Sequence, residues 1–444
     1  MAGFRLSNVP MRFLYNLLFL IGFVLSAPFY LLKMVRRGNW TDGFGERFGN
    51  YDHRLKQALT NRHVIWLHAV SVGEVNLCTQ LIRALEPRAP NYKIVVSTTT
   101  STGMAELEKL LPSHISKIYY PIDRLKYVKR AMNLIHPEAV ILVEAEIWPN
   151  FLWYLRRREV PHFLVNARLS ERSFRGYRRF GFLFRDLFAG FDGVGAQSEA
   201  DAVRLRELGC RAEAVRVVGS LKFEAAKLTE RRVLDVPGML RQLGVPEDAL
   251  IWVAGSTFAG EEAILGEILM RLRKRFPNLF LIVAPRHHER GREAGEALAA
   301  SGVRFMYRTE VTAKVQKAPG ELDCLLVNTT GELRFFYAVA DLVFVGKSLT
   351  AQGGQNPIEP AALGKAVVFG PHMQNFPQVV PQFLARGGAI QIADAAELEK
   401  TCEALLADPA RRAELGRIGQ EVVRDNLGSL DKTVEMIVEH LPPC

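Results

Sequence analysis

A glycine-rich stretch at residues 346–376 has the residue types of an anion-binding loop followed by a short helix. Gly353 and Gly354 free the backbone to turn tightly, and Asn356 can cap a helix that starts at Pro357. Backbone N–H groups at the start of such a helix attract phosphate groups. The same residues also fit an ordinary capping box, so the pattern alone leaves a binding loop and a structural loop open.

Other polar segments follow apolar runs at the places where buried strands would end. They lie at 68–74, 97–103, 144–150, 255–257, 285–288 and 331–332. Because the carboxyl ends of parallel strands meet at one edge of a sheet, we expect these segments to form ligand sites there. The segments of the first half centre on carboxylates, and those of the second half on Arg, Gly and Asn. This division suits transfer of a group from a nucleotide-linked donor.

Three glutamates of the first half are candidates for chemistry. Glu74 follows the turn that contains Ser71 and Gly73, which can present its carboxylate at the start of a helix. A base in that position could take a proton from a sugar hydroxyl, although a first-turn glutamate also stabilises a helix dipole without any chemistry. Glu144 and Glu146 form a Glu-x-Glu pair, for which we expect substrate positioning, with a purely structural duty as the alternative.

Metal-binding patterns are absent from the sequence. It contains no Asp-x-Asp and no His-Glu-x-x-His, and His287-His288-Glu289 lacks ligand spacing. The five cysteines are scattered and odd in number, which argues against a disulfide framework or a zinc site. We therefore expect no metal and no cofactor, with Arg side chains and helix dipoles stabilising the leaving group.

Apolar runs alternate with helical patterns along the chain. The expected strands are 64–67, 93–98, 139–143, 163–165 and 193–196, followed by 250–254, 279–283, 324–327, 342–345 and 366–369. Continuous apolar strands separated by helices indicate parallel sheets covered on both faces. We predict an α/β protein of two Rossmann-like domains that face one another across a cleft. Their expected bounds are 38–223 and 249–444, with the more polar segment 224–248 as a linker.

The segment 13–32 contains no charged residue. As a helix it would span about 30 Å, enough to cross the hydrocarbon core of a membrane. Lys33, Arg36 and Arg37 follow it, and this basic flank favours a cytoplasmic location for the rest of the chain. We predict a membrane anchor over residues 1–37. Polar residues within the run leave open a helix that lies in the membrane surface.

The net charge of +10 is unevenly distributed along the chain. Residues 1–222 contain 32 Lys and Arg against 19 Asp and Glu, whereas the remaining residues contain 25 against 28. An anionic partner or an anionic membrane surface should therefore meet the first half. That half contains an aromatic-rich run with Arg168, Arg172, Arg175, Arg178 and Arg179. We expect this run to bind acceptor phosphates and lipid headgroups, with a solvated surface as the alternative.

Taken in order, the motifs resemble those of the Kdo (3-deoxy-D-manno-octulosonic acid) transferases of lipopolysaccharide assembly. The matching motifs are SVGE, ExExWPN, PRH, GEL and GGxNPIEPAALGK with FGPHMQNF, which together cover nearly the whole chain. The resemblance implies the GT-B glycosyltransferase fold, with the acceptor bound by 38–223 and CMP-Kdo by 249–444. It also implies an inverting transfer of Kdo from CMP-Kdo to the 6′-hydroxyl of a lipid A precursor, lipid IVA.

The resemblance further implies roles for individual residues. Glu74 matches the general base, Arg286 can neutralise the CMP phosphate, and Asn356 with Glu359 can hold the ribose or base. The residues that match the CMP-binding motifs are Pro285, Arg286, Gly331, Glu332, Leu333, Asn356, Pro357, Ile358 and Glu359. Ser256 and Thr257 could donate further bonds to the phosphate, or could only cap a helix.

The expected location is the cytoplasmic side of a bacterial inner membrane. The expected partners are CMP-Kdo, the lipid A precursor and inner-membrane lipids, with no nucleic acid. The alternative within enzymes is another GT-B transferase that uses a UDP-sugar donor and a lipid-linked acceptor.

Overall fold

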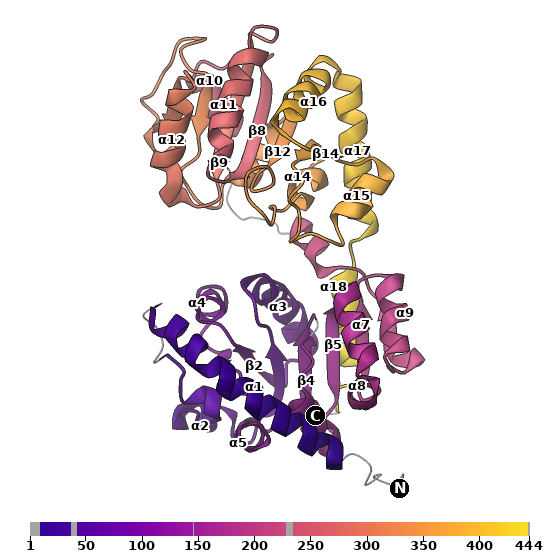
Figure 1. Ribbon diagram of the computed structural model, residues 1–444. Helices are drawn as coiled ribbons and strands as arrows, with labels where there is room; N and C mark the ends of the chain where they lie inside the picture. Colours follow the sequence, from indigo (N-terminus) through magenta and orange to yellow (C-terminus); the bar gives the residue numbers. More distant parts are fainter. Residues whose placement is uncertain (1–8, 37–41, 145, 228–233, 443–444) are drawn as a thin grey trace. The chain divides into compact units, whose positions relative to one another are not determined.

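The computed structural model describes residues 9–36, 42–144, 146–227 and 234–442. The chain forms two compact units (Figure 1). The first comprises the residues up to Lys222 together with those from Gly428 onward, and the second comprises Phe223–Leu427. The first stretch of the first unit ends at Lys222, one residue before the predicted end of the first domain, but the prediction that the second domain continues to residue 444 is wrong.

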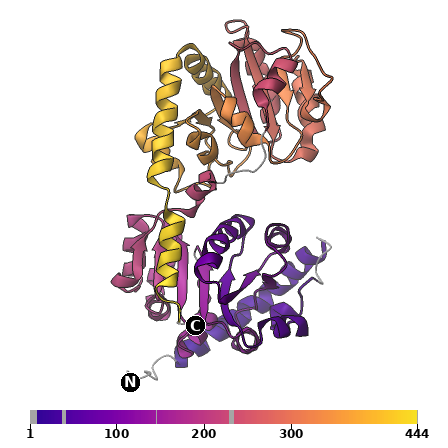
Figure 2. The ribbon, with the colours of Figure 1, turned by 180° about the vertical axis from the view of Figure 1, so that it is seen from behind.

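The difference arises from the last helix, α18 (Ser429–Val438). Its apolar side chains Val434, Met436 and Ile437 are buried in a core cluster of the first unit. Figure 2 shows this helix, in yellow, among the purple elements of the first unit. The sequence of this helix contains no signal for which of the two sheets covers its apolar side.

The first unit is built on a parallel sheet of seven strands in the order β3-β2-β1-β4-β5-β6-β7. Its strands are β1 (His63–His68), β2 (Tyr92–Thr98), β3 (Ser116–Tyr119), β4 (Ala139–Val143), β5 (His162–Ala167), β6 (Gly193–Ala196) and β7 (Val215–Val217). The helices between them are α2 (His53–Leu59), α3 (Val72–Leu85), α4 (Ser101–Leu110), α5 (Leu125–Ile135), α6 (Pro149–Arg157), α7 (Glu171–Arg179), α8 (Gly181–Phe188) and α9 (Glu199–Glu207).

Side chains of β1 show why this sheet needs helices on both faces. Val64 and Trp66 belong to one core cluster, and Ile65 and Leu67 belong to another. Because successive side chains of a strand point to opposite faces, a strand apolar at every position must be covered twice. The prediction of a doubly covered parallel sheet is therefore confirmed.

The second unit repeats this architecture with the strand order β10-β11-β9-β8-β12-β13-β14. Its strands are β8 (Leu250–Thr257), β9 (Leu279–Pro285), β10 (Phe305–Tyr307), β11 (Cys324–Leu326), β12 (Leu342–Val345), β13 (Ala366–Phe369) and β14 (Ile390–Gln391). Its helices are α10 (Val236–Gln242), α11 (Glu261–Leu272), α12 (Gly291–Ala300), α13 (Leu333–Val339), α14 (Ile358–Ala362), α15 (Val380–Arg386), α16 (Ala395–Ala407) and α17 (Pro409–Asp425).

The predicted linker 224–248 is mostly part of the second unit. Phe223, Val236 and Met239 are buried in its core, the last two on α10. Residues 228–233 of the predicted linker lie outside the described residues. Pro237 and Gly238 of this segment stand in the first turn of α10, where proline is well tolerated.

Each parallel sheet has one reversal point, on either side of which successive strands are added in opposite directions across the sheet. In the first sheet β1 and β4 are neighbours there, and in the second β8 and β12 are neighbours. Connections on the two sides of such a point run away from each other, which leaves a crevice at the carboxyl ends of the two strands. The residues after β1, β4, β8 and β12 are therefore the ones best placed to bind a ligand.

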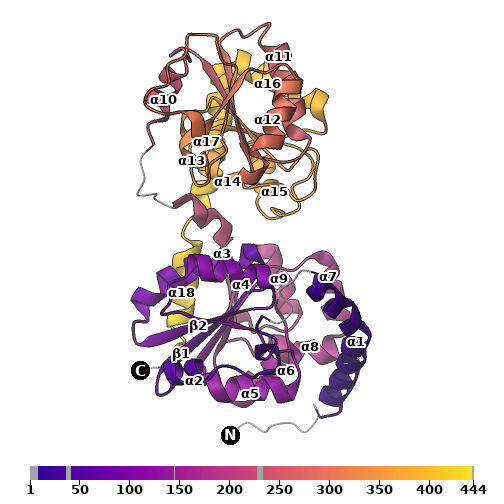
Figure 3. The ribbon, with the colours of Figure 1, turned by 90° about the vertical axis from the view of Figure 1, so that its left-hand side faces the viewer.

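The N-terminal helix α1 (Val9–Arg36) contains a stretch, Met11–Phe29, that is long and apolar enough to cross a membrane. One side of it contacts the first unit: the Tyr15 hydroxyl donates to Oδ2 of buried Asp123 at 2.8 Å, and Asn16 exchanges side-chain hydrogen bonds with Asn150. Figure 3 shows α1 along the outside of this unit, beside α6.

The other side of α1 is apolar and exposed. Phe13, Val24 and Leu25 are among the most exposed large apolar residues of the described chain. An exposed apolar surface of this kind is what a membrane would cover. The helix could therefore anchor the protein while one of its sides stays bonded to the folded unit.

Candidate functional site

The Glu74 carboxylate is fixed at the start of α3, directly after β1. Val70 N–H donates to its Oε2 at 2.8 Å, and the Ser71 hydroxyl donates to its Oε1 at 2.7 Å. Ser71 also caps α3 by accepting from the Glu74 N–H. Burial raises the pKa of Glu74, although both hydrogen bonds to the carboxylate act in the opposite direction. The side chain is partly exposed, so a substrate can reach it.

Glu144 and Glu146 follow β4, the neighbour of β1 at the reversal point. Glu144 accepts from Arg168 Nε at 3.2 Å, and its negative charge helps to raise the pKa of Glu74. Glu146 accepts from Trp148 Nε1 at 2.9 Å. Burial, followed by the charge of Glu74, raises the pKa of Glu146 to about 7. The structure thus brings the three predicted carboxylates together at one edge of the first sheet.

Two residues that the sequence analysis did not single out lie beside these carboxylates. Asn166, at the end of β5, points its amide toward Glu144 Oε1 at 3.5 Å, and its Oδ1 accepts from the Leu221 N–H at 3.1 Å. Lys222 directly follows Leu221 in the chain. It is partly buried and interacts electrostatically with Glu144, Arg168 and Glu74. Burial lowers the pKa of Lys222. We call Glu74, Glu144, Glu146, Arg168 and Lys222 the carboxylate cluster.

His68 at the end of β1 is not a second base. It is fully buried, its Nδ1 lies 2.9 Å from Ser97 Oγ, and its ring stacks on Tyr120 at 3.9 Å between centroids. Burial lowers the pKa of His68 to about 3, so the ring is neutral at physiological pH. Proton acceptance at this edge therefore falls to the carboxylates.

The predicted basic run is divided between two places. Arg168 belongs to the carboxylate cluster through Glu144. The other four arginines lie on α7 and are exposed: Arg172, Arg175, Arg178 and Arg179. Phe180 and Phe182, which follow α7, are 48% and 62% exposed. This basic and apolar surface is therefore separate from the residue that fixes Glu144.

In the second unit, Arg286 stands directly after β9 with an exposed side chain. Its backbone N–H donates to the Thr257 carbonyl at 3.0 Å, which places it beside the end of β8. Thr257 is fully buried and its hydroxyl donates to Glu262 Oε1 at 2.8 Å, so that hydrogen is already committed within the unit. Ser256 has a left-handed backbone with φ of 57° and is partly exposed.

The Gly-Glu-Leu motif joins β11 to α13. Gly331 has φ of 80°, a conformation that favours glycine, and a side chain there would meet open space. Glu332 accepts from Arg308 Nη2 at 3.1 Å and from the Thr329 hydroxyl. Leu333 begins α13. The motif is thus a tight turn held by one ion pair, next to a backbone that a ligand can approach closely.

The glycine-rich stretch has the predicted tight turn, but its helix begins at Ile358 with Pro357 as the N-cap, one residue later than predicted. Gly353 and Gly354 have φ of 118° and 69°, and Asn356 Oδ1 accepts from the Ile358 N–H at 3.0 Å. Asn356 Nδ2 donates to Glu359 Oε1 at 3.0 Å. The helix α14 that begins at Ile358, after Pro357, has only five residues. A helix this short contributes little dipole, so any ligand here would depend on the side chains of Asn356 and Glu359.

A buried carboxylate bridges the reversal point of the second sheet. Glu261, in the first turn of α11, accepts the backbone N–H groups of Lys347, Ser348 and Leu349, which follow β12, at 2.8 to 2.9 Å. It also accepts from the Phe258 N–H, which follows β8. Burial raises the pKa of Glu261 despite these bonds. Glu261 therefore fixes the loop that leads into the glycine-rich stretch.

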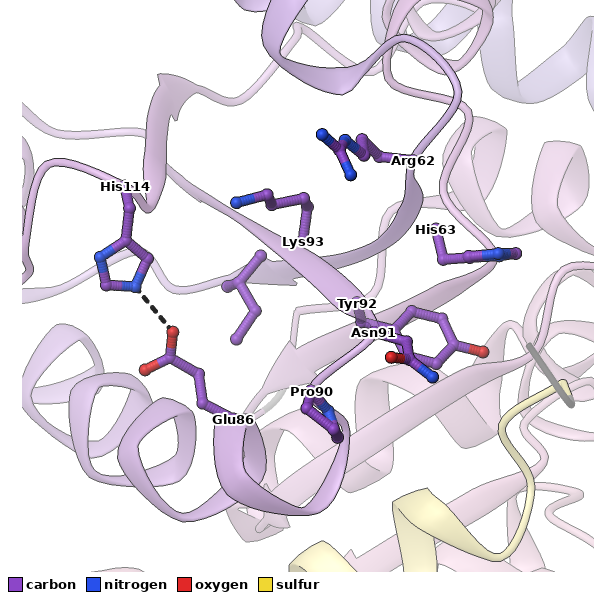
Figure 4. A pocket seen from close by; sticks show the side chains of 9 residues that line it. Arg62, His63, Glu86, Pro90, Asn91, Tyr92, Lys93 and His114 are labelled. Atoms are coloured by element: carbon purple, nitrogen blue, oxygen red, sulfur yellow. Dashed lines mark hydrogen bonds and ion pairs between the residues drawn. The ribbon is translucent and has the colours of Figure 1, made fainter.

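A cavity of about 650 Å³ in the first unit lies at the opposite edge of its sheet. Figure 4 shows Arg62 and Lys93 at this cavity, with His114 Nε2 2.8 Å from Glu86 Oε1. Its lining residues stand at the beginnings of β1 and β2, whereas Glu74 follows the end of β1. The cavity is thus remote from the carboxylate cluster and is not part of the candidate site.

Within the described residues, no group of three or more His, Cys, Asp or Glu side chains could hold a metal ion. The four described cysteines are buried and free. Chemistry without a metal or cofactor stays a prediction.

Three comparisons identify relatives of the chain. The model of the 3-deoxy-D-manno-octulosonic-acid transferase (kdotransferase) family matches residues 42–225. The 3-deoxy-D-manno-octulosonic acid transferase of Haemophilus influenzae is 31% identical, over 97% of this chain and 99% of its own. That of Bordetella pertussis is 34% identical over 94% and 97%. The UDP-GlcNAc 2-epimerase of Neisseria meningitidis shares the fold, with a TM-score of 0.55 and 13% identity over 85% of this chain and 100% of its own.

Two Rossmann-like units with polar loops at their reversal points define a protein of the GT-B fold. With relatives above 30% identity over nearly its whole length, the chain belongs to the Kdo transferase family. It is therefore a glycosyltransferase of lipopolysaccharide core biosynthesis, and both the predicted fold class and the resemblance are confirmed.

Replacing Glu261 tests the bridge at the second reversal point. Glu261→Ala would leave four backbone N–H groups without their acceptor, each costing about 1–3 kcal/mol when buried. We expect the free energy of unfolding to fall by at least about 3 kcal/mol. Hydrogen exchange should accelerate at the amides of Lys347, Ser348 and Leu349. Glu267→Ala, at a 61% exposed position of the same helix, is the control and should change neither quantity appreciably. Unchanged exchange in Glu261→Ala would show that the bridge does not hold the loop.

Proposed function

We propose that the protein transfers Kdo from CMP-Kdo to the 6′-hydroxyl of a lipid A precursor, lipid IVA, with inversion at the anomeric carbon. The observation that carries this proposal is the position of Glu74. Its carboxylate is partly desolvated, fixed by Val70 and Ser71, and placed at the carboxyl end of β1 beside the reversal point.

Glu74 is suited to act as the general base. Each of its oxygens accepts one hydrogen bond from the protein and keeps a further lone pair for the acceptor hydroxyl. As the hydroxyl oxygen bonds to the anomeric carbon, its proton passes to Glu74. CMP departs from the opposite face with the electrons of the broken C–O bond, so the configuration inverts. A raised pKa makes Glu74 a stronger base than an exposed glutamate.

The CMP leaving group would be bound by the second unit. Arg286 has an exposed guanidinium at the end of β9, which can form paired hydrogen bonds with a phosphate. Gly331 leaves room for close approach of the ligand to the backbone. Asn356 and Glu359 would bind the ribose or base, and Glu261 would keep their loop in place.

The acceptor would be bound by the first unit at the cytoplasmic side of the inner membrane. The four exposed arginines of α7 suit the phosphates of a lipid A precursor, and Phe180 and Phe182 suit its surrounding lipids. The exposed apolar side of α1 would hold the protein at the bilayer.

Product mass tests the reaction directly. We expect the purified protein, given CMP-Kdo and lipid IVA, to increase the mass of the lipid by one or more Kdo units. Glu74→Gln should lower the rate roughly 10²–10⁴-fold because the base is lost. Glu86→Gln, which lies at the other end of α3 next to His114, is the control and should transfer normally. Turnover with UDP-sugars and none with CMP-Kdo would reject the proposed donor.

A second variant tests the nucleotide site. Arg286→Ala should raise the KM for CMP-Kdo roughly 10–100-fold, since a hydrogen bond to a charged group contributes about 1.5–3 kcal/mol. The control is Arg292→Ala, because Arg292 is also exposed but lies on α12 and pairs with Glu296 at 2.9 Å. If the KM for CMP-Kdo does not differ between the two variants, Arg286 does not contribute to donor binding.

A further inference from the structure

The N-terminal helix α1 contacts the first unit along one of its sides. From Arg12 to Phe29, the half-buried residues of this helix are Arg12, Tyr15, Asn16, Phe19, Ser26 and Ala27. Their spacing, mostly three, four and seven residues, places them on the same side of a helix. This side is therefore shielded by the protein from Arg12 to Ala27, a length of about 22 Å (Figure 3).

Two polar contacts fix the beginning of this side to the start of α6. The Tyr15 hydroxyl donates to Oδ2 of Asp123 at 2.8 Å, and the side-chain amides of Asn16 and Asn150 donate to each other at 3.2 and 3.0 Å. Asp123 and Asn150 are buried, and the Asp123 oxygens also accept the N–H groups of Asn150 and Phe151. If α1 left the unit, these buried polar groups would lose partners that lipid chains cannot replace. The contacts therefore favour a helix that stays on the unit when the protein meets a membrane.

A helix that crosses the membrane cannot keep these contacts. From Asn16 to Arg36, where α1 ends, the helix is about 30 Å long, which is the thickness of the hydrocarbon core. If α1 crossed that core, Asn16 and Arg36 would lie at opposite faces of the membrane. Glu46, ten residues after Arg36, already accepts the backbone N–H of Tyr119 in the same folded unit as Asn150. Ten residues are too few to cross back as a helix, and irregular chain is not stable in hydrocarbon. Both ends of α1 therefore lie on the side of the first unit.

The charges and the apolar residues of α1 also fit a helix in the membrane surface. Basic residues stand near both ends, with Arg12 at one end and Lys33 and Arg36 at the other. A crossing helix would bring one of these ends to the face that basic residues avoid, whereas a helix in the surface places both near anionic headgroups. The apolar side chains on the open side of α1, such as Leu25 with 76% exposure, would be buried among the acyl chains.

We propose that α1 lies flat in the cytoplasmic surface of the membrane and does not cross the bilayer. Its open apolar side faces the acyl chains, and its other side stays on the first unit through Tyr15 and Asn16. This inference rests on the proposed membrane location and not on the proposed reaction. The first unit is then held against the headgroups along the length of α1, instead of being tethered only by the segment after Arg36.

The position of the N-terminus tests this orientation. The full chain carries one protease-cleavable tag before Met1 and another after Cys444, and sealed inner-membrane vesicles are prepared with the cytoplasmic face outward. We expect the protein to remain with the vesicles and the protease to remove both tags to the same extent without detergent. An N-terminal tag that is cleaved only after detergent opens the vesicles would show a crossing helix and overturn the inference. A protein that is absent from the vesicles would overturn it together with the proposed location, whereas Kdo transfer by that soluble protein would leave the proposed reaction intact.

A cross-link tests whether α1 stays on the unit in the same vesicles. Asn16→Cys combined with Asn150→Cys should be joined by a short thiol cross-linker, as read by the masses of the linked peptides, because the two side chains are in contact. The matched control is Leu25→Cys with Asn150→Cys, which should not be joined because Leu25 lies on the open side. Failure of the first pair to link in a folded protein would contradict the docking of α1. If the substitution of buried Asn150 prevents folding, the two tags still decide the orientation.

Discussion

The candidate chemistry of this protein depends on one constraint, the fixing of the Glu74 carboxylate at the end of β1. The backbone N–H of Val70 and the hydroxyl of Ser71 hold its two oxygens, and Ser71 at the same time caps the helix that carries it. These bonds stabilise the ionised form, whereas burial disfavours it, and burial has the larger effect on the pKa. The result is a carboxylate with a defined orientation and increased basicity.

The surrounding structure maintains this balance. β1 and β4 are neighbours at the reversal point, which brings Glu144 and Glu146 close to Glu74. Arg168 pairs with Glu144, and Asn166 ties the segment before Lys222 to the same edge. Without the positive charges of Arg168 and Lys222, the carboxylates of the cluster would take up protons, and Glu74 could no longer act as a base. The second unit uses a comparable solution, because Glu261 fixes the loops after β8 and β12 through backbone N–H groups.

Much of the fold could be predicted from the sequence because the central strands are apolar at nearly every position. That pattern is typical of a parallel sheet covered on both faces, and each of the ten predicted strands is present. The strands β3, β7, β10 and β14 were not predicted. They are short and lie at the outer positions of their sheets, where burial leaves a weaker pattern. The return of α18 to the first unit was also missed, because an amphipathic helix does not specify which sheet it covers.

The candidate site was predicted less completely than the fold. Glu74, Glu144 and Glu146 could be found because they follow apolar runs, and the structure brings them together. Lys222 stands in a segment without any strand signal, and the bond between Leu221 and Asn166 holds this segment at the cluster. Glu261 resembles an ordinary first-turn glutamate in the sequence. Its role in fixing the loop after β12 depends on hydrogen bonds from residues more than eighty positions away in the chain.

The pH dependence of kcat/KM tests the central claim most directly, since it reports the ionisation of the free enzyme. The account predicts an acid limb whose midpoint lies above the ordinary glutamate pKa of 4.5, with activity lost as the pH falls and Glu74 becomes protonated. In Glu144→Gln one neighbouring negative charge is removed, so the midpoint should move to lower pH. An acid limb at the same pH in both proteins, or a rate independent of pH through this range, would contradict the assignment of Glu74 as the base.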